Sequence, residues 1–248
     1  MYKLPVLNII IEAFWYPWKY KYQMFNALAL PVAIVVIVST AWYEFGVTVS
    51  RLSWIYYIAY VFSFSFFAIS CHRFVLIGAD NKVSQPYSLI IKKIIFFTLL
   101  GMLIYLLAGI PFWFILTIAM NVLSDETLLS SSHNLTADNF NWVKLLLMLP
   151  FGYFVGRFSL VLPATAIDVR TNLMWSWEVT KYNGTRMLIL IGAVPWVTTI
   201  LLDLLWRENG TMFEYVFLSM LGYLAVAVEI FILSIAFREI HRIEQVEN

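Results

Sequence analysis

Cysteine is almost absent from this chain, and charge is scarce. The single cysteine, Cys71, excludes an internal disulfide and any metal site built from several cysteines. Charged residues make up 12% of the 248 residues, whereas soluble domains typically carry about 25%. The sequence also lacks a glycine-rich phosphate loop, a zinc-protease histidine pair and a nucleophile elbow. We therefore predict no catalytic, cofactor-binding or metal-ligating residues.

Hydrophobic residues, by contrast, make up 62% of the chain and fall into several long runs. A helix of about 20 apolar residues is long enough to cross the hydrocarbon core of a bilayer. The sequence therefore predicts an all-α polytopic membrane helix bundle, with residues 1–248 forming one integral membrane domain. We expect six transmembrane helices, at about 26–45, 54–77, 92–120, 143–167, 187–205 and 213–237.

Two further segments mix aromatic and basic side chains, a composition typical of the headgroup region. Residues 4–22 predict an interfacial segment that is broken at Pro17, although the start of the first span is an alternative. Residues 171–182 resemble it, with Trp175 and Trp177 as interfacial anchors. Asp168 is expected to cap this second interfacial helix, because aspartate favours helix starts.

The distribution of lysine and arginine predicts the orientation, since cytoplasmic loops are enriched in both. With both termini cytoplasmic, 13 of these 16 residues lie on the cytoplasmic side and three on the other. The N-terminal segment lacks the pattern of a cleaved secretory signal, so we expect the first spans to direct insertion. The three outer residues are Arg51, Lys144 and Arg207.

The fourth predicted span contains an unusual stretch that runs from Gly152 to Asp168. The Gly-x-x-x-Gly pair, Gly152 and Gly156, lets another helix approach closely. Pro163 lies farther along the same apolar run, and we expect it to take part in the helix packing. The stretch is therefore predicted to lie against protein rather than lipid.

Two charged residues, Arg157 and Glu229, lie deep inside predicted spans, and a third, Arg73, lies near a span end. A rise of 1.5 Å per residue places Arg157, Glu229 and Arg73 about 18, 24 and 28 Å from the outer face. Their depths predict a buried Arg157–Glu229 pair that shares Arg73. Such a cluster either clamps helices together or binds a lipid headgroup, relays protons or gates a path.

An arginine lies beside a phenylalanine at the end of each even-numbered span. The pairs are Arg73-Phe74, Arg157-Phe158 and Phe237-Arg238, and the arginines are separated by 84 and 81 residues. This spacing is consistent with a repeat of three helical hairpins. Chance enrichment of arginine and phenylalanine at cytoplasmic helix ends is the alternative.

The run from Arg157 to Asp168, RFSLVLPATAID, is followed by WSWEVTKYNG from Trp175 to Gly184. These motifs resemble a group of bacterial six-span proteins, which is similar to the membrane domain fused to some glycerophosphodiester phosphodiesterases. Ser176, Trp177 and Thr180 match the group's pattern, whereas the turn that follows is reordered here. The resemblance implies six helices in a bacterial inner membrane, and it implies no catalytic residues.

Three functions are compatible with these features. The first is a non-enzymatic accessory, assembly or scaffold subunit, which would contact membrane lipids and either another membrane protein or a second copy of itself. The second is a lipid or small-molecule transporter of flippase type, favoured by the prolines within spans and the embedded charges. The third is a membrane enzyme that acts on lipid headgroups. A net charge of +1 gives no reason to expect nucleic acid as a partner.

Overall fold

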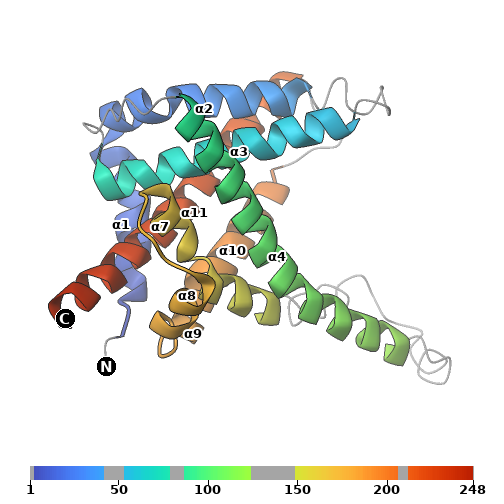
Figure 1. Ribbon diagram of the computed structural model, residues 1–248. Coiled ribbons are helices and arrows are strands. Elements are labelled where there is room, and N and C mark those ends of the chain that lie inside the picture. The colour runs from blue at the N-terminus through green and yellow to red at the C-terminus, as the bar shows by residue number, and fades with distance from the viewer. Residues whose placement is uncertain (1–2, 42–52, 79–86, 124–148, 206–211, 248) are drawn as a thin grey trace.

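In the computed structural model, residues 3–41, 53–78, 87–123, 149–205 and 212–247 are described, and all their regular secondary structure is helical. Residues 149–158 form a helix that carries no label in Figure 1. The other elements are α1 Val6–Lys19, α2 Lys21–Ala41, α3 Ser53–Ile77, α4 Tyr87–Leu123, α7 Val161–Ala166, α8 Leu173–Val179, α9 Gly184–Leu188, a π-helical turn η3 Ile189–Ala193, α10 Val194–Asp203 and α11 Met212–Glu247.

Five helical segments in the described ranges are long and apolar enough to cross a membrane. They overlap five of the six predicted spans, and the second prediction, 54–77, coincides with its segment. The chain is therefore an all-helical protein with the composition of a membrane helix bundle. The five segments are Lys21–Ala41, Trp54–Ile77, Leu89–Phe114, Gly184–Leu202 and Val216–Ile243.

The fourth predicted span, 143–167, differs from the prediction. Its first six residues lie outside the described ranges, and the rest is two short helices, 149–158 and α7, separated by a turn at residues 159–160. Pro163 explains the break, because it has no N–H to donate to the Ser159 carbonyl four residues earlier. That carbonyl accepts instead from the Leu162 N–H at 2.9 Å.

The N-terminal segment is also more regular than predicted, since α1 continues through Pro17 and ends at Lys19. The chain turns at Tyr20, whose N–H bonds to the Tyr16 carbonyl at 3.1 Å. Ile9 and Ala13 of α1 are buried in the core. Packing of this face stabilises the helix despite the proline. The break predicted at Pro17 is therefore wrong.

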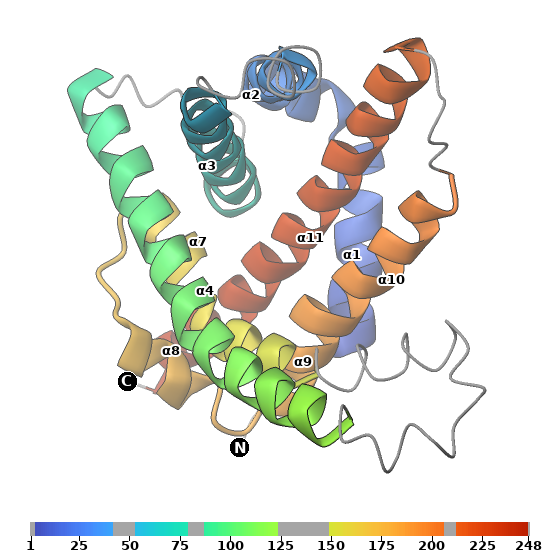
Figure 2. The same cartoon turned by 90° about the vertical axis from the view of Figure 1, so that its right-hand side faces the viewer.

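The core forms around α11, which runs through the middle of the bundle (Figure 1). In Figure 2, α4 and α10 lie on opposite sides of α11, and α2 and α3 are seen nearly end-on. Both ends of the chain lie on the same side of the molecule in Figure 1. The largest fully buried side chains include Phe67, Phe231, Phe237, Leu160 and Met187.

Candidate functional site

Arg157 is 3% exposed and is held by neutral groups rather than by an acid. Its Nε donates to the Thr180 hydroxyl at 2.8 Å, and its Nη1 donates to the Tyr153 hydroxyl at 2.9 Å. Its Nη2 donates to the Trp177 carbonyl. The guanidinium carbon also lies 3.8 Å from the centroid of the Trp177 ring, a cation–π contact. The Arg157 side chain thus connects α8 and its C-terminal end to the helix at residues 149–158.

The same contact is reinforced by the backbone and by aromatic packing. The Ser176 hydroxyl donates to the Arg157 carbonyl at 2.7 Å. The Trp177 ring stacks on Phe158, with centroids 5.1 Å apart, and on Phe154 at 6.0 Å. We name Arg157, Tyr153, Ser176, Trp177 and Thr180 the Arg157 cluster. It brings together the runs that begin at Arg157 and at Trp175, and its geometry is that of a structural contact between two helices.

Gly152 and Gly156 make their close approach within the chain. A Cβ on Gly152 would lie 3.3 Å from the Gly192 Cα, and one on Gly156 would lie 3.0 Å from the Met187 carbonyl oxygen. Both glycines therefore pack against α9 and η3 rather than offering a surface to another protein. Pro163, buried in α7, breaks the predicted span just before that helix.

Asp168 does not cap the following helix, which corrects the prediction. The cap is Asn172, whose side chain accepts from the Trp175 N–H at 2.7 Å. Asp168 lies too far before α8 and has a left-handed backbone with φ of 64°. Its carboxylate instead accepts from Lys93 Nζ at 2.6 Å and lies 3.6 Å from Arg73 Nη1. Trp175 packs edge-on against Phe237 in the core.

The predicted cluster of Arg157, Glu229 and Arg73 does not form. Arg73 belongs to α3 and contacts the C-terminal end of α7, where its Nη1 donates to the Ala166 carbonyl at 2.9 Å. Glu229 lies on α11 and lines the same groove as Thr198 of α10. Similar depth did not bring the three together, because depth fixes position along the membrane normal and not around the bundle. The Arg157–Glu229 pair is therefore replaced by two separate environments.

Glu229 lines a groove with a volume of about 910 Å³ between α1, α2, α10 and α11. Among the described residues that line this groove, Glu229 is the one acid and Lys21 the one base. Trp18 and Lys21 line one end of the groove, and the lining residues of α2 extend from Lys21 to Val36. The fifteen-residue separation of Lys21 and Val36 corresponds to about 22 Å of helix. That exceeds one leaflet of the hydrocarbon core, which is about 15 Å thick.

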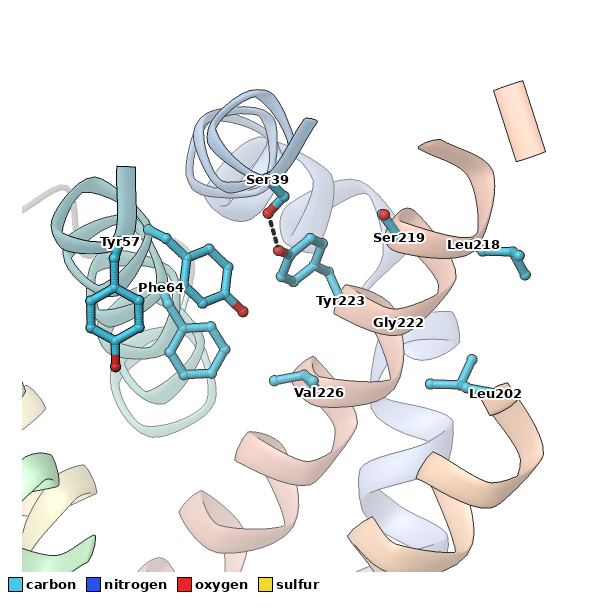
Figure 3. A pocket seen from close by; sticks show the side chains of 10 residues that line it. Ser39, Tyr57, Phe64, Leu202, Leu218, Ser219, Gly222, Tyr223 and Val226 are labelled. Atoms are coloured by element: carbon cyan, nitrogen blue, oxygen red, sulfur yellow. Dashed lines mark hydrogen bonds between the residues drawn. The ribbon is translucent and has the colours of Figure 1, made fainter. Parts of the chain in front are cut away.

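A second pocket, of about 620 Å³, lies on another side of α11. Figure 3 shows Tyr223 of α11 directed toward Ser39 of α2, with which it forms a hydrogen bond, while Tyr57 and Phe64 project from α3. The lining is aromatic and hydroxylic and has no charged side chain among the described residues. We name this second pocket the hydroxyl pocket. Leu202 of α10 lines both the hydroxyl pocket and the groove.

His72, adjacent to Cys71, has a structural environment. Its Nδ1 lies 2.7 Å from the Ser234 hydroxyl, and both His72 and Cys71 are buried. Within the described ranges, no three histidine, cysteine, aspartate or glutamate side chains lie close enough to bind a metal ion.

Sequence reasoning did not predict several of these contacts. The shared position of Ser176 and Thr180 was open to detection, because positions four residues apart lie on one helix face. Lys93 and the Ser39–Tyr223 pair gave no such signal, because their partners lie 75 and 184 residues away.

No protein-family model, curated protein or solved structure matches this chain.

Proposed function

We propose that this protein binds an amphiphilic molecule in the groove between α1, α2, α10 and α11 and moves it across or within the membrane. The observation that carries the proposal is the composition of the groove. Its lining is apolar along about 22 Å of α2, with Lys21 at one end and Glu229 within it. Ligand sites typically combine such an apolar lining with a few placed polar groups.

Packing within the chain weakens the case for an accessory subunit. In the sequence, the Gly-x-x-x-Gly pair indicated contact with protein, and the embedded arginine was compatible either with clamping helices or with a transport path. Both now have partners inside the same chain, in α9 and α8 respectively. The exposed aromatic side chains Tyr105, Trp113 and Phe114 on α4 can pack against lipid as well as against a protein partner or a second copy. An accessory or scaffold role therefore remains a second proposal.

Filling the groove should displace its occupant. We expect Ala225→Phe, which adds a ring inside the groove, to lower the amount of co-purified lipid or solute at least about tenfold, a loss of roughly 1.4 kcal/mol. The measurement is native mass spectrometry of protein released from nanodiscs of phosphatidylethanolamine and phosphatidylglycerol. Glu229→Gln keeps the shape and removes the charge, so it should reduce flux of the retained molecule more than its binding.

Gly101→Leu on α4 is the matched control, because a Cβ there meets open space. Equal occupancy in wild type and Ala225→Phe would contradict the proposal. A protein that co-purifies at a fixed ratio, with an empty groove, would instead favour the accessory subunit.

We further propose that the chain crosses a bacterial inner membrane six times, with both termini cytoplasmic, and belongs with the six-span group that it resembles. The helix at 149–158 together with α7 would form the fourth crossing, in addition to the five candidate segments. The 13-to-3 distribution of lysine and arginine supports the orientation. In this arrangement α1 and α8 are the interfacial helices. The hairpin repeat has the weakest support, because Arg73, Arg157 and Arg238 all have different partners.

Cysteine labelling tests this topology with little background, since the native Cys71 is buried. We expect a membrane-impermeant maleimide to label Leu205→Cys in intact bacterial cells, because Leu205 follows α10, which ends on the outer side in the proposed topology. Lys3→Cys and Arg242→Cys should react only after permeabilisation. Labelling of Lys3→Cys and Arg242→Cys from opposite sides would require an odd number of crossings and would overturn the six-span proposal.

A further inference from the structure

A small cavity of about 150 Å³ lies between α3 and α4 and combines two cations with an apolar wall. Arg73 and Ser70 line it from α3, and Lys93 lines it from α4. Ile69 and Ile94 belong to the apolar part of the lining. This basic cavity is separate from both the groove and the hydroxyl pocket, and none of its lining residues is shared with them.

The two cations share the carboxylate of Asp168. The Asp168 side chain is 56% exposed, whereas those of Arg73 and Lys93 are 21% and 11% exposed. Partly buried positive charge attracts an anion more strongly than the same charge in water.

Arg73 has donors to spare for such an anion. Toward the described part of the chain, it uses only Nη1, which donates to the Ala166 carbonyl and approaches Asp168. Its Nε and Nη2 therefore remain for a ligand, and guanidinium groups suit phosphate oxygens. The Ser70 hydroxyl donates to the Phe66 carbonyl at 2.8 Å, so we assign it no donor role.

The size and surroundings of the cavity fit a phosphate group better than a larger solute. The cavity has the volume of about five water molecules at 30 Å³ each, comparable to the five heavy atoms of a phosphate. The neighbouring face of α4 exposes apolar side chains, with Ile91 56% and Ile95 40% exposed, along which acyl chains can lie.

We propose that the basic cavity binds the phosphate of an anionic phospholipid headgroup, with Arg73 and Lys93 as the recognising cations. Basic pockets between membrane helices commonly recognise such headgroups. The site is independent of the proposed function, because it shares no residue with the groove.

Competition between lipids tests the site. Full-length protein is released from nanodiscs with equal amounts of phosphatidylglycerol and phosphatidylcholine, and retained lipids are counted by native mass spectrometry. Wild type should prefer phosphatidylglycerol, and Lys93→Gln should lower that preference about tenfold, because it removes a direct charged contact to the headgroup phosphate. Lys92→Gln, at an adjacent exposed lysine, is the control and should lower the preference much less, because it removes only the general attraction of one surface cation.

Asp168→Asn separates a lipid site from a purely structural ion-pair network. It removes the acid that competes with the lipid phosphate, and asparagine tolerates the left-handed backbone at this position. A lipid site predicts a higher preference for phosphatidylglycerol in this variant. Unchanged or lower preference in Asp168→Asn, or no loss in Lys93→Gln, would overturn the proposal. Displacement of phosphatidylglycerol by millimolar inorganic phosphate would identify free phosphate, not lipid, as the ligand.

Discussion

Replacing Arg157 with methionine should destabilise the protein far more than the same exchange at an exposed arginine. The variant loses three hydrogen bonds from a buried guanidinium and leaves the Tyr153 hydroxyl and the Trp177 carbonyl without this donor. Hydrogen bonds to charged groups contribute about 1.5–3 kcal/mol each, but they are not additive, so we expect a loss of about 3–5 kcal/mol. For a chain of this size, the melting temperature should fall by roughly 6–20 °C.

Thermal melts of purified protein in one detergent measure the effect. Arg242→Met is the matched control, because the Arg242 side chain is 69% exposed and pairs only with Glu239 in the part of the chain described. Arg157→Lys should recover little stability, since lysine cannot reach three acceptors in a fixed plane or stack on Trp177 in the same way. A melting temperature for Arg157→Met near that of Arg242→Met would contradict the fastening role of the Arg157 cluster.

Gly156→Ala should have the second largest effect on stability. It should lower the melting temperature, whereas the same exchange at Gly101 should not. A Cβ on Gly156 would lie 3.0 Å from the oxygen and 3.1 Å from the carbon of the Met187 carbonyl. Both atoms belong to the backbone and cannot move aside as a side chain can, so the helices must separate. Overpacking of this kind costs about 1–3 kcal/mol.

Gly101→Ala provides the contrast, because its new Cβ meets nothing within 4 Å. Alanine is the better helix former by about 1 kcal/mol, so this variant should melt at or above the wild-type temperature. Equal shifts for the two alanines in thermal melts would mean that contact between the helix at 149–158 and α9 contributes little to stability.

How far the sequence predicts the fold is clear from the spans. The segment 54–77 was predicted accurately, because the hydrophobicity and length of a membrane helix are local properties of the chain. The prediction for 143–167 erred at Ser159 and Leu160, where Pro163 alters the hydrogen bonding three to four residues earlier. A proline within an apolar run permits either a kink or a break, and packing decides between them.

The sequence by itself determined that this is a helical, membrane-type chain without a recognisable catalytic motif, because composition and hydrophobic runs depend on near neighbours alone. Only the tertiary structure decided that Arg157 lies on Trp177, that Asp168 faces Lys93, and that Glu229 lines a groove. The reason is geometric. Counting residues gives the depth of a side chain, but the rotation of each helix about its axis and the angle at which helices cross determine which side chains meet.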